Sequence, residues 1–213
     1  MKSLLSALAG AATWTLAEYG IHRHLGHDPE LHPNPFSREH RRHHATTSYF
    51  APSYLKVLAA AGALAAVAPA ASALLGLRAG TSFAAGFASA YLGYEVVHRL
   101  AHVAAPRTSY GRWLRRHHFH HHFHNPKRNH GVTSPLWDHL FGTFEEPSVV
   151  RVPAKHVMPW LLDPMTRQLR PEHVGDYEVR STKPKQHADA AAPPIHRGPK
   201  GAPEPSGRPA YSG

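Results

Sequence analysis

Histidine is the residue type with the clearest capacity for chemistry in this chain, and it is concentrated in one part of the sequence. Of the 21 histidines in 213 residues, 16 lie between His22 and His130. Imidazole nitrogens bind zinc, copper, iron and nickel, so the ligand type alone does not name the metal. The chain has no cysteine, which excludes thiolate metal sites and disulfide bonds. The composition therefore predicts a metal site built from imidazole, carboxylate and water ligands.

Four histidine clusters have spacings that suit metal binding. They are His22 and His27 (H-x4-H), His40, His43 and His44 (H-x2-H-H), His98 and His102 (H-x3-H), and His118, His121 and His122 (H-x2-H-H). Residues three and four apart share one face of a helix, so each H-x2-H-H segment can direct three imidazoles to one point. The H-x4-H spacing is too wide for a regular helix face, and we expect that pair to straddle a helix end beside Gly26. Ten imidazoles are too many for one ion, which predicts two ions with about five nitrogens each.

Spacing alone leaves some histidines unassigned. In the last cluster, a second set on a rotated helix face consists of His117, His120, His121 and His124. The pattern does not choose between the two sets, and His24 and His32 are candidates for an outer layer or for solvent-exposed positions. Adventitious metal binding by solvated helices is the simplest alternative, but scattered histidines would rarely produce four clusters with ligand spacing.

Three apolar segments must position these clusters. Residues 3–17, 57–77 and 79–94 contain no Asp, Glu, Lys or Arg. A helix rises about 1.5 Å per residue, so about 20 residues cross the hydrocarbon layer of a membrane. The second and third segments predict a helical hairpin that turns near residues 70–80. We therefore predict an all-α integral membrane bundle of about three membrane helices with a histidine-rich helical cap. The alternatives are buried core helices of a soluble protein and, for the first segment, a secretory signal peptide.

The basic residues indicate an orientation for this bundle. The formal net charge is +10, and arginines follow the first and third apolar segments, whereas the short turn between the second and third contains only Arg78. The positive-inside rule then predicts a multi-pass protein of a bacterial inner membrane whose histidine clusters face the cytoplasm. Anionic headgroups account for the basic residues, and we expect no nucleic-acid partner because no stacking aromatic motif accompanies them.

The end of the chain differs in composition from the rest. From about residue 181 Pro, Gly, Ser, Ala and Lys predominate, and such a segment has too little apolar surface to offset its ordering entropy. We therefore predict a membrane domain over residues 1–162 and a polar, Pro-rich, disordered tail over residues 163–213.

The ordered motifs resemble the fatty acid hydroxylase superfamily, membrane di-iron proteins that include sterol desaturases and sphingolipid hydroxylases. The resemblance extends from about Thr15 to Glu145. Its segments are Glu18-Tyr19-x-x-His22-Arg23, the first H-x2-H-H, Tyr94-Glu95-x-x-His98, His118-Phe119-His120-His121-His122 and Gly131-Val132-Thr133-Ser134-Pro135-Leu136-Trp137-Asp138. The order of the four clusters is most similar to the fatty acid 2-hydroxylase branch, which acts on sphingolipid acyl chains. Two departures are His130, where the family usually has an aromatic residue, and the lack of a preceding cytochrome b5 domain.

The resemblance implies a ligand set and a reaction. It selects His118, His121 and His122 over the rotated set, and it implies two iron ions held by the ten clustered histidines, which zinc can replace in purified protein. No catalytic residue beyond the metal ligands is expected. The implied reaction is hydroxylation of a lipid acyl chain with O2 as co-substrate. Because no cytochrome b5 domain precedes the core, we expect a separate electron donor, either a ferredoxin or a cytochrome b5-like protein with its reductase.

Other functions share these features. A desaturase or a sterol or carotenoid oxidase of the same family would use the same hydrogen abstraction and differ in the fate of the radical. A non-catalytic membrane metal-binding or transport protein is the alternative from another class, but a transporter places polar ligands near mid-membrane. We also expect that Glu18, Glu95 and Asp138 either orient ring N–H groups or, for Asp138, cap a turn.

Overall fold

The described part of the chain is mostly helical. The computed structural model describes residues 1–180, and the part of the predicted disordered tail over residues 181–213 lies outside the described residues. The helices are α1 (Lys2–Gly20), α2 (Pro35–Ala45), α3 (Ser53–Leu75), α4 (Leu77–Val103), α5 (Ser109–Phe123) and α6 (Leu136–Leu140). The shorter turns are a π-helix, η1 (Ile21–Gly26), and 3-10 helices η2 (Pro29–Leu31), η3 (Ala154–His156) and η4 (Pro171–His173). The first and third predicted apolar segments thus lie within α1 and α4, and the second covers most of α3 and the turn into α4.

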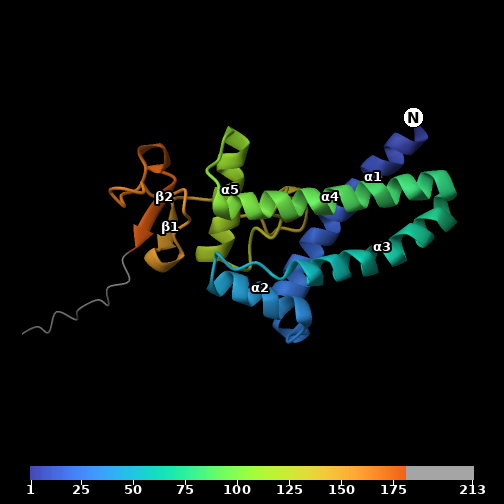
Figure 1. The fold of residues 1–213 in the computed structure, drawn as a ribbon, viewed down its shortest axis with the longest axis horizontal. Helices are drawn as coiled ribbons and strands as arrows, with labels where there is room; N and C mark the ends of the chain where they lie inside the picture. The colour runs from blue at the N-terminus through green and yellow to red at the C-terminus, as the bar shows by residue number, and fades with distance from the viewer. Residues whose placement is uncertain (181–213) are drawn as a thin grey trace, which may run out of the picture. The chain divides into compact units, whose positions relative to one another are not determined.

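The long helices α3 and α4 form the predicted hairpin, with its turn at a single glycine. Gly76 has a φ of 81°, a conformation that glycine adopts without the steric penalty of a side chain. Pro69 lies inside α3 without ending it. Figure 1 shows α3 and α4 side by side, joined at one end, with α5 crossing the opposite end of α4. The hairpin therefore delivers the last turns of α4, and the two histidines on them, next to α5.

Small residues allow α1 and α4 to pack backbone against backbone. A Cβ atom built on Gly86 of α4 would lie 1.9 Å from the carbonyl oxygen of Ala7, and one on Gly10 of α1 would lie 2.0 Å from that of Phe83. Neither distance is tolerable for a real Cβ atom, so both positions require glycine. Close approach at glycine is a common way for helices to associate in lipid. This contact sets the position of α1, and therefore of the histidines that follow it.

We predict that Gly86→Ala destabilises the protein, whereas Gly93→Ala on the same helix does not. A Cβ atom on Gly93 meets nothing within 4 Å, and both substitutions gain up to about 1 kcal/mol of helix propensity. Only the first overpacks the interface between α1 and α4, at an expected cost of about 1–3 kcal/mol or more. Thermal unfolding in detergent measures the difference, and equal midpoints for the two variants would contradict this packing.

One described helix is long and apolar enough by itself to cross a membrane. Within residues 1–180 this is α3, with 23 residues and a mean hydropathy of 1.9, and only 6% of its most apolar window is buried. The helices α1 and α4, of 19 and 27 residues, do not meet the same criterion because they include more polar residues. A bundle of three membrane-crossing helices therefore remains a prediction.

A two-stranded parallel sheet departs from the predicted all-α fold. Strand β1 (Val150–Pro153) pairs with β2 (Tyr177–Arg180), with Val150 opposite Tyr177. Four-residue strands close to a Pro-rich tail carry too short a pattern to predict. The predicted boundary at residue 162 would separate β1 from its partner, and β2 lies in the stretch predicted as disordered. The folded structure instead continues to Arg180.

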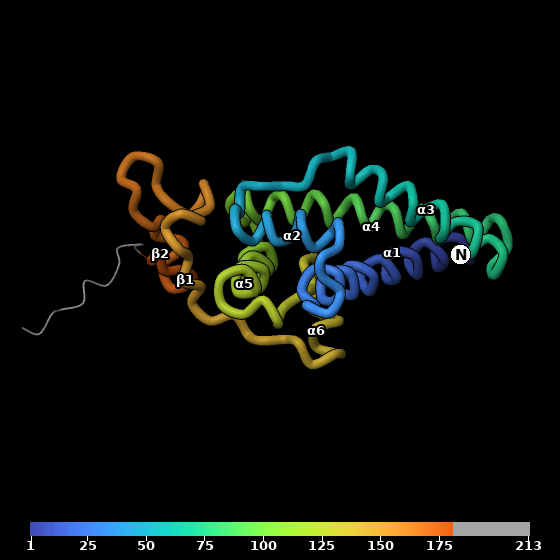
Figure 2. Tube along the Cα trace, turned by 90° about the horizontal axis from the view of Figure 1, so that it is seen from below, coloured from blue at the N-terminus to red at the C-terminus, as the bar shows by residue number. Residues whose placement is uncertain are grey.

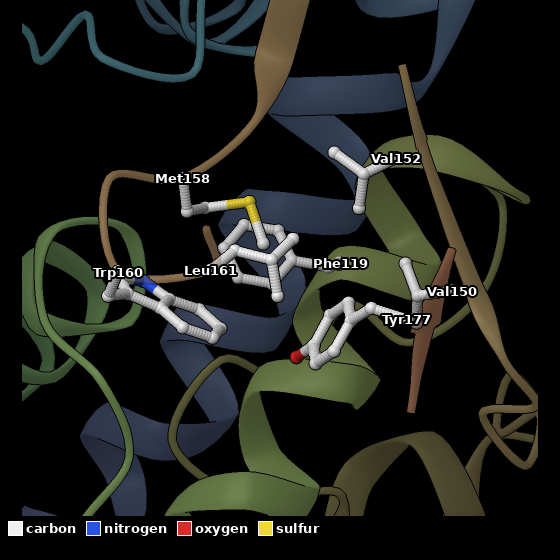
Figure 3. Close-up of a cluster of buried hydrophobic side chains, with 7 residues drawn as sticks. All are labelled: Phe119, Val150, Val152, Met158, Trp160, Leu161 and Tyr177. Atoms are coloured by element: carbon white, nitrogen blue, oxygen red, sulfur yellow. The ribbon is translucent and has the colours of Figure 1, made fainter. Parts of the chain in front are cut away.

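A compact apolar cluster attaches this sheet to α5. Phe119 of α5 is fully buried against side chains of both strands and of the segment between them. Figure 3 shows the cluster, which consists of Phe119, Val150, Val152, Met158, Trp160, Leu161 and Tyr177. Burying these side chains favours one rotational setting of α5 about its axis. This setting lets the histidines of α5 reach α2 and α4, and the Phe119 ring also borders His102 and His122, with centroids 5.0 and 6.0 Å away. Figure 2 shows α2 and α4 beside α5.

Candidate metal centre

Ten histidine side chains converge in two groups of five. In each group, one nitrogen of every imidazole lies within 4.8 Å of those of the other four. The first histidine group consists of His22, His27, His40, His44 and His121, and the second histidine group of His43, His98, His102, His118 and His122. These are the ten residues that the four sequence clusters contain. The structure therefore brings together the predicted set. His117, His120 and His124, which belong to the rotated set, are in neither group.

A π-helical turn explains how the H-x4-H pair reaches a common point. η1 follows α1 without a break, and a π-helix bonds residues five apart instead of four. His22 and His27, which are five apart, therefore point to the same side, with ring centroids 5.2 Å apart. The predicted helix end is also present, because His27 is the C-cap of η1. The π-helix was not predicted, although the spacing of five residues was a signal for it.

The helix α2 contributes to both groups. It begins at a capping box in which the Asn34 side chain accepts from the N–H of Ser37 (2.8 Å) and the Ser37 hydroxyl accepts from the N–H of Asn34 (2.9 Å). This cap defines where the helix starts, and its last two turns carry the H-x2-H-H cluster. His40 and His44 enter the first histidine group, and His43 enters the second.

The helix α5 is shared in the same way, with the opposite assignment. His118 and His122 enter the second histidine group and His121 enters the first. In each H-x2-H-H helix the i, i+4 pair enters one group and the residue between them enters the other. The prediction that each such segment directs its three imidazoles to one point is therefore wrong. His98 and His102 complete the second group from the end of α4.

Backbone hydrogen bonds leave the inward-facing nitrogens unprotonated in three of these imidazoles. The Nδ1 atoms of His22, His43 and His121 lie 2.5, 2.7 and 2.7 Å from backbone carbonyl oxygens. The accepting carbonyls belong to His130, Tyr49 and Arg128. A carbonyl only accepts, so Nδ1 must donate, and a neutral imidazole then has a lone pair on Nε2. Such partners of the outer nitrogen are the usual support of metal-binding histidines.

The separations between the inner nitrogens fit the coordination of an ion. The Nε2 of His121 lies 2.9 Å from that of His27 and 3.2 Å from that of His44. In the second group, the corresponding distances are 3.0 Å for His98 to His43 and 2.9 Å for His102 to His118. Nitrogens about 2.0–2.1 Å from a shared ion lie about 3 Å apart when their bonds are perpendicular. Because the lone pair of His121 faces two other nitrogens, a cation between them would relieve the repulsion.

Burial keeps the imidazoles of the two histidine groups neutral. Desolvation lowers the pKa of His22 to about 3 and the pKa values of His27 and His43 to about 4, and neighbouring cations and imidazoles contribute in the same direction. A buried charge without a counter-ion is unfavourable, so these rings are deprotonated at neutral pH. Neutral imidazole is the form that binds a metal. The electrostatics therefore agree with the geometry.

The predicted carboxylates bind backbone and neighbouring side chains instead of the ring nitrogens of the two groups. Glu18 accepts from the N–H groups of Val132 (2.6 Å) and Thr133 (3.0 Å) and from the Thr133 hydroxyl (2.7 Å). Glu95 forms an ion pair with Lys56. The prediction that Glu18 and Glu95 orient the rings of the histidines one turn later is therefore wrong, because within residues 1–180 neither carboxylate bonds to those rings. Glu18 instead joins α1 to the segment before α6.

Asp138 acts on the first histidine group through the backbone. Its side chain is fully buried and accepts from the N–H groups of His130 and Gly131 (both 2.8 Å) and from the Thr143 hydroxyl (2.7 Å). Burial alone would raise the pKa of Asp138, but hydrogen bonds from His117, Gly131, Thr143 and His130 outweigh it and lower the pKa. The carbonyl of His130 then accepts from His22. The backbone of His130 thus connects Asp138 through two hydrogen bonds to His22, a candidate ligand.

The remaining histidines near the centre have other partners. His120 lies 3.1 Å from a Glu145 oxygen, and His117 lies 3.4 Å from an Asp138 oxygen. The ring of His130 is buried beside the first histidine group, with centroids 5.3 Å from His121 and 5.5 Å from His22, but it is not a member of that group. His130 departs from the family pattern, and its spacing in the sequence does not mark it as a neighbour of the candidate centre. Its position shows that its backbone and its ring both border the candidate centre.

Comparison with known proteins places these features in a family context. Residues 7–143 match the fatty acid hydroxylase family. The chain is 29% identical over 151 residues to a dihydroceramide fatty acyl 2-hydroxylase of Arabidopsis thaliana, which covers 63% of this chain and 58% of that protein. It is 31% identical over 158 residues to a ceramide very long chain fatty acid hydroxylase of Schizosaccharomyces pombe, which covers 70% of this chain and 46% of that protein.

A solved structure gives the same indication. Full-length scs7p, in which only the hydroxylase domain is visible, matches with a TM-score of 0.56 and 28% identity, over 68% of this chain and 57% of that chain. The present chain spans about half the length of the curated relatives, 58% and 46% in the two cases. The similarity therefore concerns the helices and clusters described above.

Proposed function

Because this chain belongs to the fatty acid hydroxylase family, we propose that it is a membrane-bound di-iron oxygenase that hydroxylates the acyl chain of a lipid. The observation that supports the proposal most directly is the pair of five-imidazole groups built on shared helices. Both relatives, at about 30% identity, bear names of fatty acid hydroxylases. One of them is named a fatty acyl 2-hydroxylase, which favours the 2-position of an acyl chain as the carbon oxidised.

The ten grouped histidines are the proposed ligands, five for each ion. Iron bound there would supply the activation of O2 that hydroxylation of an unactivated C–H bond needs. The protein itself would keep the imidazoles neutral, present their Nε2 lone pairs and shield the site from water. The two electrons would come from a separate ferredoxin or cytochrome b5-like protein with its reductase. Zinc could occupy the same nitrogens in purified protein, since imidazole does not discriminate strongly between these metals.

The placement of the centre supports a lipid substrate. The first histidine group begins two residues after α1, and the second includes the last turns of α4. Large apolar side chains of α3 are exposed, such as Leu58 (65%) and Leu74 (83%), and a bilayer is the solvent that suits such a surface. We propose that α1, α3 and α4 lie in the membrane with the histidine groups at its cytoplasmic surface. A lipid chain between these helices would then approach the ions from the membrane side.

Comparative lipidomics of cells that express the protein tests this function. Expression of the native chain is expected to produce lipids heavier by one oxygen atom, and fragmentation should place the oxygen on the acyl chain. A matched strain that expresses His98→Ala should lack these species at equal protein level. Loss of two hydrogens in place of gain of oxygen would identify a desaturase, and an unchanged lipid profile with fully iron-loaded protein and its electron donor would contradict the proposal.

A further inference from the structure

A pocket at the start of α5 is rich in arginine and lies apart from the histidine groups. Its volume is about 440 Å³, and its polar lining includes Arg107, Thr108, Ser109, Arg112 and Arg116, with the ring of Trp113 beside them. Within residues 1–180 no aspartate or glutamate lines the pocket. Three guanidinium groups around one cavity select an anion, and guanidinium matches the oxygens of a phosphate especially well.

The charges around the pocket are only partly balanced. Arg116 bonds to Asp176 (2.9 Å), Arg112 lies 3.8 Å from the same carboxylate, and Glu146 lies 3.8 Å from Arg116 with 66% of its side chain exposed. Arg107 forms no ion pair with any residue of the described chain. Asp176 therefore holds two arginines in place, and a net positive charge remains. The Nε atom of Arg116 is buried without a partner among residues 1–180, and such a donor is unfavourable unless a ligand or water accepts from it.

An exposed and largely apolar stripe on α4 precedes this pocket along the chain. The stripe consists of Leu92, Val96, Leu100 and Val103, whose exposed fractions are 62%, 56%, 45% and 44%. Their spacing of three or four residues puts them on one face of the helix, which they share with the exposed Arg99. The stripe is about 16 Å long at 1.5 Å per residue, which is the length of an acyl chain segment within one leaflet. Val103 is the last residue of α4, and the pocket lining begins three residues later.

We propose that this pocket and the stripe together bind an anionic membrane phospholipid, with its phosphate among the arginines and its acyl chain along α4. The proposal rests on the membrane placement proposed above and is independent of metal binding and of hydroxylation. The occupant is a lipid and not a free phosphate because a stripe of acyl-chain length with four exposed apolar side chains leads along α4 to within three residues of the pocket lining. Trp113 at the pocket is a residue type that favours the level of the headgroups. This lipid would be a bound partner of the enzyme and not its substrate.

Native mass spectrometry of the full chain in an uncharged detergent tests the proposal. Phosphatidylglycerol is expected to bind, and zwitterionic phosphatidylcholine is expected to bind at least several-fold more weakly. Arg107→Ala should weaken phosphatidylglycerol binding about fivefold, which corresponds to the usual contribution of one arginine at an anionic lipid surface. The matched control is Arg151→Ala on β1, which removes the same charge from a half-exposed side chain paired with Glu178 and should leave binding unchanged.

A second variant separates the lipid from a free anion. Leu100→Ser alters the stripe without changing any charge, and it should weaken phosphatidylglycerol binding while leaving competition by inorganic phosphate unaffected. The proposal would be overturned by equal binding of the two lipids, by an Arg107→Ala variant that binds like the native chain, or by inorganic phosphate that displaces the lipid at equal concentration. Metal content, measured in the same samples, should be the same in all variants, so failure here is distinguishable from failure of the proposed enzyme function.

Discussion

Replacement of His121 or His98 by alanine is expected to abolish lipid hydroxylation and to lower the bound metal from about two ions per chain. His121 contacts two other nitrogens of the first histidine group, and His98 contacts His43 in the second. Each substitution removes one of five imidazoles. Loss of an outer partner of a ligand already reduces metal affinity or activity about 10–100-fold, so loss of a ligand itself should exceed that range. Metal analysis of protein produced with added iron and mass spectrometry of the lipid product measure the two effects.

The control for these variants is a histidine outside both groups. His24 lies in the same π-helix as His22, but its side chain is 52% exposed and faces Asp28 at 3.8 Å. His24→Ala should retain both ions and the activity. Native metal content and activity in both the His121→Ala and the His98→Ala proteins would refute their assignment as ligands. Loss of metal in the His24→Ala protein as well would indicate general loss of folding instead.

The second large effect is expected for Asp138→Asn. The amide keeps one accepting oxygen and turns an NH2 group towards a backbone N–H donor, so at least one buried donor becomes unpaired. An unpaired buried donor costs about 1–3 kcal/mol, and the unfolding midpoint should fall accordingly. Because the backbone of His130 connects Asp138 to His22, we also expect the affinity of the first histidine group for metal to fall about 10–100-fold.

Chelator competition together with thermal unfolding tests the Asp138 variant. A suitable control is Asp163→Asn, because Asp163 also accepts from two backbone N–H groups, at Met165 and Thr166, but in an exposed turn. Asp163→Asn should leave metal affinity unchanged. If Asp138→Asn releases metal at the same chelator concentration as the native protein, then the hydrogen-bonded connection to His22 does not control the site.

The candidate ligands could be predicted from the sequence because their spacing is a local property. Histidines three or four residues apart on a helix lie on neighbouring positions of its surface, and this fact alone identified five of the ten grouped residues, namely His40, His43, His44, His98 and His102. Family resemblance then selected His118, His121 and His122 over the rotated set, and the comparisons confirm that resemblance. The H-x4-H pair was identified as a ligand pair, but the expected helix end accounted for its geometry only in part.

The partners of the carboxylates could not be predicted because they depend on contacts between distant segments. Glu18 binds Val132 and Thr133, 114 and 115 residues away, and no periodicity near Glu18 indicates them. Glu95 pairs with Lys56 because the hairpin of α3 and α4 brings the two side chains together. The strands β1 and β2 are also a long-range pairing, and each is only four residues long.

The sharing of α2 and α5 between the two histidine groups has a consequence for how the ions are acquired. A first ion that orders these helices also aligns the histidines that the second ion needs, so the second ion would bind to a site already preorganised. Filling should therefore be cooperative, and chains with a single ion should be scarcer than independent binding would produce. When the metal is limiting, the population would divide into molecules that hold both ions and molecules that hold none.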